Sequence, residues 1–282
     1  MKYVSVNGAS IPAIGLDTLR MTPSDIVYTL PLGLKRGLRH VDTAQIYGNE
    51  AAIGEMLQMS GVPRDELFLA TKVWPENYRS VEFRKSVEVS LANLRCSHVD
   101  LLFLHWPSRT VPLADQIGEL NEVVSRGYAK YIGLANFPTD LMIEASNLSE
   151  NRLIANQVEY HPYLNQDRVL SAARKLGIAV VASHTEADGS VCKDPLLLDI
   201  AAAHGKTTAQ VVLRWLVQQD RVVALTRAVT ATQIAASLAV SAFELSAEEV
   251  ADIRTLARPD GRLLNPAGFA PSWDSVPTQT AI

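Results

Sequence analysis

Residues 99–105, VDLLFLH, are a short apolar run that ends in a polar residue, and a longer stretch with helical spacing follows them. This unit occurs eight times along the chain. Short, almost wholly apolar runs are typical of strands that are buried on both faces. The predicted strands cover residues 13–16, 38–41, 67–71, 99–104, 131–134, 153–156, 179–182 and 222–225. Eight strand–helix units in a chain of this length predict an α/β fold, a closed (β/α)8 TIM barrel with an outer ring of helices.

Signals at the ends of elements complete this prediction. Thr22-Pro23 predicts a capped helix start with proline in the first turn, and residues 207–210 and 246–249 have the capping-box pattern. Asn7-Gly8, inside the alternating residues 2–12, predicts an N-terminal β-hairpin. Residues 258–282 are rich in Pro and Gly and predict an irregular C-terminal tail. Because no linker or charge run divides the chain, residues 1–282 are predicted to form one domain.

The composition excludes several classes of protein. The 282 residues are 48% hydrophobic with a formal net charge of -4, which allows a large core and leaves no basic surplus for nucleic acid or anionic membranes. Only Cys96 and Cys192 are present, and neither a secretory signal nor an apolar run of about 18 residues occurs. We therefore expect a cytoplasmic protein. The absence of a G-x-G-x-x-G turn and of a Cys/His cluster argues against an open doubly wound sheet and against a metal site.

Polar side chains stand where the predicted strands end. Because the strands of a parallel barrel converge at their carboxyl ends, these side chains are expected around one cavity. In chain order they are Thr18, Asp42, Lys72, His105, Asn136, Gln157, Ser183 and Arg227, with Tyr47 in the loop after Asp42.

Four of these residues, Asp42, Tyr47, Lys72 and His105, together suit proton delivery to a carbonyl group that is being reduced. The ammonium of Lys72 is expected to lower the pKa of the Tyr47 phenol, and the carboxylate of Asp42 is expected to keep Lys72 charged. Neutral His105 can donate a hydrogen bond to a carbonyl oxygen. Taken singly, each residue also has a structural interpretation, such as a helix cap, an ion pair or a core histidine.

Four segments resemble motifs of the aldo-keto reductase family. They are residues 40–50 (HVDTAQIYGNE), 71–74 (TKVW), 99–107 (VDLLFLHWP) and 156–162 (NQVEYHP). The similarity extends as far as Asp274. The tail segments 260–263 and 270–274 are most similar to the bacterial 2,5-diketo-gluconate reductase and methylglyoxal reductase subgroup.

The resemblance implies a monomeric barrel that binds NADPH across the carboxyl ends of its strands and reduces small aldehydes and ketones. It implies that Tyr47 is the general acid, that Lys72 and Asp42 tune it, and that His105 orients the carbonyl group. The implied cofactor-binding residues are Thr18, Asn136, Gln157, Ser183, Arg227 and Gln233, with Arg227 at the adenosine 2'-phosphate. The implied substrate-pocket residues are Leu19, Trp74, Trp106 and Trp273.

Several positions depart from the family pattern. Asp17 stands where glycine is usual, Leu19 where an aromatic residue is usual, and Ala135 where serine is usual. Ser183 replaces the aromatic residue that stacks on nicotinamide, and Gln233 replaces a second arginine at the 2'-phosphate. Losing a charge-assisted hydrogen bond costs on the order of 1.5 to 3 kcal/mol, or one to two decades of affinity. We therefore expect weakened 2'-phosphate contacts, which makes NADH possible as the cofactor. The alternative is a cofactor-binding sensor or regulatory subunit on the same barrel with little turnover.

Overall fold

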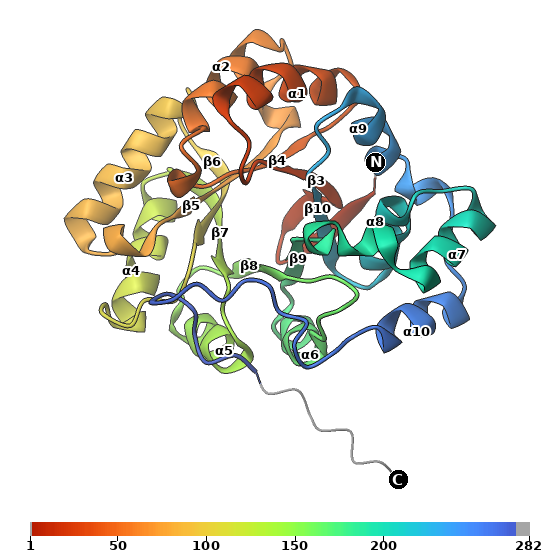
Figure 1. The fold of residues 1–282 in the computed structure, drawn as a ribbon. Helices are drawn as coiled ribbons and strands as arrows, with labels where there is room; N and C mark the ends of the chain where they lie inside the picture. The colour runs from red at the N-terminus through yellow and green to blue at the C-terminus, as the bar shows by residue number, and fades with distance from the viewer. Residues whose placement is uncertain (1, 275–282) are drawn as a thin grey trace.

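The computed structural model describes residues 2–274. Eight parallel strands close into a barrel in the order β10-β3-β4-β5-β6-β7-β8-β9, and helices surround it (Figure 1). The strands are β3 (Ile14–Asp17), β4 (His40–Asp42), β5 (Phe68–Val73), β6 (Val99–Leu104), β7 (Ala129–Ala135), β8 (Leu153–Glu159), β9 (Ala179–Ser183) and β10 (Val222–Thr226). The barrel predicted from the eight repeated units is confirmed.

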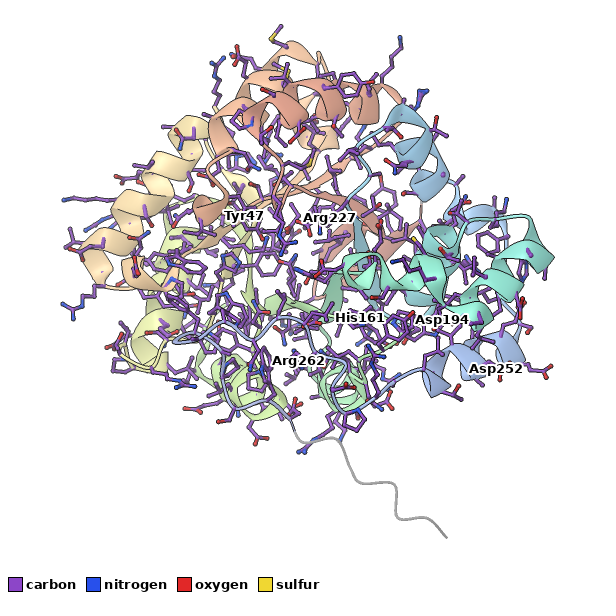
Figure 2. The ribbon with its side chains drawn as sticks, viewed as in Figure 1. Tyr47, His161, Asp194, Arg227, Asp252 and Arg262 are labelled. Carbon is purple, nitrogen blue, oxygen red and sulfur yellow. The ribbon has the colours of Figure 1, made fainter. Side chains whose placement is uncertain are left out.

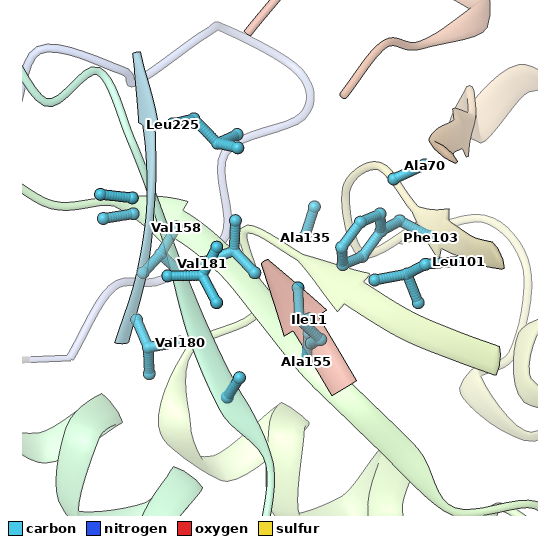
Figure 3. Close-up of a cluster of buried hydrophobic side chains, with 14 of the residues drawn as sticks. Ile11, Ala70, Leu101, Phe103, Ala135, Ala155, Val158, Val180, Val181 and Leu225 are labelled. Carbon is cyan, nitrogen blue, oxygen red and sulfur yellow. The ribbon is translucent and has the colours of Figure 1, made fainter. Parts of the chain in front are cut away.

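The barrel strands are buried on both faces, as their apolar sequences predict. Every residue of β3, β4, β5, β6, β8 and β10 is buried. Side chains from strands far apart in the sequence, among them Phe103, Val158 and Leu225, meet in the interior (Figure 3). Burial of apolar surface at this scale is the main term that stabilises the fold.

Helices cover the outside of the barrel, as the eight repeated units predict. They are α1 (Pro23–Lys35), α2 (Glu50–Met59), α3 (Ser80–Asn93), α4 (Leu113–Ser125), α5 (Thr139–Leu148), α6 (Asp167–Leu176), α7 (Pro195–His204), α8 (Thr208–Gln218), α9 (Ala231–Leu238) and α10 (Ala247–Thr255). Short 3-10 helices are η1 (Gln45–Tyr47), η2 (Arg64–Glu66), η3 (Pro75–Asn77), η4 (Ala187–Lys193) and η5 (Val240–Ala242). Capping boxes at Thr22, Thr207 and Ser246 confirm the three predicted helix starts. None of the helices among residues 2–274 is long and apolar enough to cross a membrane.

The N-terminal hairpin lies at the amino ends of the barrel strands. It consists of β1 (Tyr3–Val6) and β2 (Ala9–Pro12), and its turn residues Asn7 and Gly8 have φ values of 43° and 86°. These positive φ values are the ones that an Asn-Gly turn accommodates. The side chain of Asn7 donates a hydrogen bond to the carbonyl of Leu153 at the start of β8, and Ile11 is fully buried in the core (Figure 3). The predicted hairpin is thus confirmed, and it leaves the carboxyl ends of the strands for a cavity.

The tail returns across the carboxyl ends of the strands. Residues 258–274 contain no helix or strand, as predicted, and the blue chain in Figure 1 crosses in front of β8. The part of the predicted tail from residue 275 to 282 lies outside the described residues. Strand β8 extends to Glu159, three residues beyond the predicted end at 156, and this extension supplies the group that holds the tail.

Candidate active site

A cavity of about 410 Å³ opens at the carboxyl ends of the barrel strands. Six of the nine residues that the strand-end pattern singled out line it: Tyr47, Lys72, His105, Asn136, Gln157 and Ser183. Leu19, Trp74 and Trp106 form apolar parts of its wall. The structure therefore brings together most of the side chains that the strand-end pattern singled out.

A buried ion pair forms the floor of this site. Lys72 Nζ donates to Asp42 Oδ1 at 2.5 Å and to the carbonyl oxygen of Thr43 at 2.8 Å. The two charged side chains are 2% and 0% exposed. Gln157 Nε2 also donates to Asp42 Oδ1, at 3.2 Å. Because an isolated buried ammonium is costly, this pairing keeps Lys72 charged, as the sequence predicts.

Tyr47 lies at the end of η1, directly after β4. Lys72 Nζ is 5.4 Å from the centroid of the Tyr47 ring, and the ring meets His105 edge-on at 5.8 Å between centroids. Burial, followed by the charges of Asp17 and Asp42, raises the pKa of the Tyr47 phenol well above its ordinary value. The net shift is therefore opposite to the predicted lowering by Lys72, because burial dominates and the carboxylates of Asp17 and Asp42 add to the rise.

His105 is neutral at physiological pH. Burial lowers the pKa of its imidazole well below the ordinary value, and the Lys72 ammonium lowers it further. Its ring packs edge-on against Trp74 at 5.2 Å between centroids. A neutral imidazole retains one N–H donor, which is the form that the sequence analysis requires for contact with a carbonyl oxygen.

Two side-chain amides line the cavity from neighbouring strands: Asn136 directly follows β7, and Gln157 is in β8. Asn136 Nδ2 donates to the carbonyl oxygen of His105 at 2.9 Å, and Gln157 Nε2 is bound to Asp42. Gln157 Oε1 is buried and has no partner among the described residues. A free acceptor in a cavity wall fits the NH2 group of a carboxamide such as that of nicotinamide.

Three predicted cofactor residues do not line the cavity. The hydroxyl of Thr18 is fully buried and donates to the carbonyl oxygen of Asp42. Arg227 lies 4.0 Å from Asp188 and follows β10, which only β3 separates from the β4 strand that precedes Tyr47 (Figure 2). Gln233 Oε1 accepts the backbone N–H groups at positions 229 and 230, since it forms a capping box at the start of α9. The side chains of Thr18 and Gln233 thus form hydrogen bonds to nearby backbone groups instead of facing the cavity.

Arg20 is a cation of this site that the sequence analysis missed. It lines the cavity, and its guanidinium lies 3.6 Å from Asp188 Oδ1, the same oxygen that Arg227 approaches. Two guanidinium groups therefore share one carboxylate at the rim, and a positive charge is left over. Its place directly after Leu19, two residues beyond the predicted strand-end residue Thr18, is the signal that could have found it.

The tail lines the cavity with residues other than the predicted Trp273. Trp273 does not line the cavity: its ring lies under the guanidinium of Arg262, 3.6 Å from the ring centroid, and contacts Trp106 at its edge. Leu264 and Pro266 line the cavity instead. The cation–π contact with Arg262 and a hydrogen bond from the indole N–H to Asn265 Oδ1 at 2.9 Å stabilise the indole in this position.

Glu159, at the end of β8, holds this part of the tail. Its carboxylate accepts hydrogen bonds from the backbone N–H groups of Leu263 and Leu264 at 2.6 and 2.8 Å. It also forms a hydrogen bond of 2.9 Å with the ring nitrogen Nε2 of His161. Burial alone would raise the pKa of Glu159, but these hydrogen bonds together lower it. Arg262 of the tail lies 3.7 Å from the same carboxylate, and Figure 2 labels both Arg262 and His161. Glu159 therefore stays ionised and fixes the segment that carries Leu264.

Two further polar groups face the cavity. Asp17, at the end of β3, is 2% exposed, and its Oδ1 accepts the N–H of Leu19 at 2.9 Å. Burial, followed by the charge of Asp42, raises the pKa of Asp17 from 3.8 to about 6. His184 is 6% exposed, has a φ of 54°, and neither ring nitrogen has a partner among the described residues. From the sequence, Asp17 is distinguished only as a departure from the family pattern.

Comparison with known proteins agrees with this geometry. The model of the aldo/keto reductase family matches residues 12–258. The chain is 37% identical over 268 residues to methylglyoxal reductase DkgB of Yersinia pestis, covering 94% of this chain and 100% of that protein. It is 34% identical to morphine 6-dehydrogenase of Pseudomonas putida, covering 94% and 95% of the two chains. A solved structure with the provisional name 2,5-diketo-D-gluconic acid reductase B has a TM-score of 0.96 at 52% identity and covers 98% of each chain. The chain therefore belongs to the aldo/keto reductase family, and it is an NAD(P)H-dependent enzyme that reduces carbonyl groups.

Proposed function

We propose that this cavity reduces the aldehyde or ketone group of a small molecule to an alcohol, with Tyr47 as the general acid. One observation carries the proposal: Tyr47, His105 and Lys72 line a single cavity at the carboxyl ends of the strands, and Asp42 holds Lys72 from behind in a buried ion pair. A bound nicotinamide cofactor supplies the hydride. A phenol and a neutral imidazole that approach the same substrate oxygen can donate to it as negative charge develops there.

The protein side of the reaction divides among these groups. Neutral His105 donates a hydrogen bond to the carbonyl oxygen and orients it. The Tyr47 hydroxyl then passes its proton to the same oxygen. Lys72, held by Asp42 and Thr43, places a positive charge 5.4 Å from the Tyr47 ring as the phenol becomes negative. The field of this ammonium reduces the free-energy cost of a buried negative charge on the Tyr47 oxygen.

The cofactor is held by groups around the same rim. Asn136 and Gln157 offer amide oxygens to its carboxamide, and Arg227 offers a cation to the adenosine phosphate. Ser183 lines the cavity but presents no aromatic face for stacking. These features support nicotinamide binding with fewer contacts than the family pattern has.

The cofactor preference should accordingly be weak. Gln233 carries no charge and is bound to backbone groups of α9, and Arg227 shares Asp188 with Arg20. We expect the Kd values of NADPH and NADH to differ by less than about one to two decades, the difference that one more charge-assisted phosphate contact would add. Isothermal titration with each cofactor measures this ratio. Gln233→Arg should tighten NADPH binding and leave NADH binding unchanged. Submicromolar NADPH binding by the wild type with strong rejection of NADH would contradict the prediction.

The substrate is proposed to be a small aldehyde or ketone, such as methylglyoxal or a keto sugar. Two observations support this class. Relatives of the chain are named for methylglyoxal and 2,5-diketo-gluconate. The cavity of about 410 Å³ combines an apolar wall at Trp74, Trp106 and Leu264 with polar groups on its floor. We propose further that residues 1–282 act as one domain and as a cytoplasmic monomer.

Absorbance at 340 nm tests the proposed function. The wild type should oxidise NADPH or NADH with at least one member of a panel of methylglyoxal, aromatic aldehydes, keto sugars and keto steroids. Cofactor binding without oxidation across the panel would instead support a sensor or regulatory subunit. The weakened cofactor contacts, taken alone, are compatible with such a subunit.

A further inference from the structure

Asp17 is a carboxylate in the cavity to which the reaction proposed above gives no task. It ends strand β3, and its Cα is paired in register with that of Asp42 on β4. Its side chain is buried, and one oxygen is fixed by the N–H of Leu19 at 2.9 Å. Asp17 lines the same cavity as Tyr47 and Lys72. It therefore stands close to the group that must become negative during the reaction.

The charges around this point do not balance. Lys72 is the one ammonium on the cavity floor among the described residues, and it donates to Asp42 and Thr43 but not to Asp17. When both carboxylates are ionised, the floor carries two negative charges against one positive charge.

The other titratable groups that face Asp17 do not restore the balance. His105 on the β6 side and His184 after β9 are neutral, because burial lowers the pKa of each imidazole. His40, next to Asp42 on β4, is neutral for the same reason. Arg227, after β10, and Arg20 are cations, but both lie against Asp188. The positive charge that Arg20 and Arg227 leave over lies at the rim, and neither guanidinium forms an ion pair with Asp17. Burial and Asp42 outweigh the partial offset that Lys72 and Arg227 give to Asp17, so the two carboxylates leave a local excess of negative charge beside Tyr47.

We propose that Asp17 is a positioning residue that acts through space on Tyr47, and that its ionised carboxylate slows carbonyl reduction while its protonated form does not. The inference rests on the function proposed above. As the hydride arrives, the substrate oxygen and the Tyr47 phenol together gain negative charge. A fixed negative charge on Asp17 raises the energy of that state, and a neutral carboxyl group leaves it unchanged.

The direction of two pKa shifts supports this role. Asp17 is among the causes that raise the pKa of Tyr47, second only to burial. Burial in turn raises the pKa of Asp17 to about 6, so the carboxyl changes its charge between mildly acidic and neutral pH. Turnover should consequently fall as the pH rises through 6. Reduction and alcohol oxidation share one transition state, so both directions should slow by the same factor at a given pH.

The pH profile of Asp17→Asn tests the proposal. Asparagine keeps an oxygen for the Leu19 N–H and removes the charge. For the wild type, kcat/KM for carbonyl reduction should fall between pH 5 and pH 8 by roughly threefold to tenfold, which corresponds to a change of half a unit to one unit in the pKa of Tyr47. Asp17→Asn should match the wild type at pH 5, lack this fall, and exceed the wild type by the same factor at pH 8. Asp220→Asn, which removes an exposed carboxylate before the start of β10, should retain the wild-type profile.

A measurement without turnover accompanies the profile. In ligand-free protein labelled with carboxyl-13C aspartate, one resonance should titrate near pH 6 and be missing from Asp17→Asn. Titration of Asp17 near pH 4, identical profiles for Asp17→Asn and the wild type, or slower turnover of Asp17→Asn at every pH would each overturn the role of Asp17. A wild type that reduces no carbonyl compound would overturn the proposed function itself.

Discussion

Tyr47→Phe should lower kcat for carbonyl reduction by about 10²- to 10⁴-fold, the range that a positioned general acid contributes. The substitution removes only the hydroxyl. The ring contacts with His105 at 5.8 Å and with Lys72 at 5.4 Å involve the ring itself and should persist. The proposed cofactor contacts involve other groups, chiefly Asn136 and Gln157. We therefore expect the Kd of NADPH for the variant to equal that of the wild type.

Initial rates at 340 nm and cofactor titration by tryptophan fluorescence measure the two quantities separately. Tyr128→Phe is the matched control, since its hydroxyl bonds Glu88 at 3.0 Å just before β7 begins, at the other end of the barrel. That variant should keep the wild-type kcat. Equal losses of turnover and cofactor binding in Tyr47→Phe would assign Tyr47 a structural role and contradict its role as the acid.

Asp17→Asn should stabilise the protein at pH 8 by about 3 kcal/mol, because the pKa of Asp17 is displaced by about two units and each unit corresponds to about 1.4 kcal/mol. In the unfolded chain the carboxyl titrates near its ordinary value of 3.8, and in the folded protein it titrates at about 6. Below pH 3.8 the carboxyl is protonated in both states, so its pKa shift does not change the free energy of unfolding. As the pH rises toward 6, the unfolded chain releases this proton first, so the folded wild type loses stability. Above pH 6 the full cost of the buried charge is present.

Denaturant unfolding at a series of pH values tests this prediction. The difference in the free energy of unfolding between Asp17→Asn and the wild type should be small near pH 4, grow up to pH 6, and stay constant above it. Asp220→Asn should change stability little at any pH, because Asp220 is 68% exposed and its contact with Arg221 spans 3.9 Å. A variant less stable than the wild type at pH 8 would show that Asp17 gains more from its partners than it loses by burial.

Much of the fold could be predicted because its signals are local. Each barrel strand is an apolar run that ends in a polar residue, and each predicted helix start at residues 22, 207 and 246 is a capping box that forms within four residues. The Asn7-Gly8 turn likewise depends on its own backbone angles. The ends of strands could not be predicted in the same way. The length of β8, for example, depends on its pairing with β7 and β9 rather than on its own sequence.

The sequence by itself determined the barrel, the strand-end residues and the pairing of Lys72 with Asp42, because parallel strands bring their carboxyl ends together whatever the packing details. Only the tertiary structure decided which of the predicted site residues line the cavity: Thr18 and Gln233 are bound to backbone groups, and Trp273 packs against Arg262. It also decided the charge balance at Tyr47. The pKa of a buried group depends on the charges that other strands bring to it, and Asp17 reaches Tyr47 through the pairing of β3 with β4, not through its position in the chain.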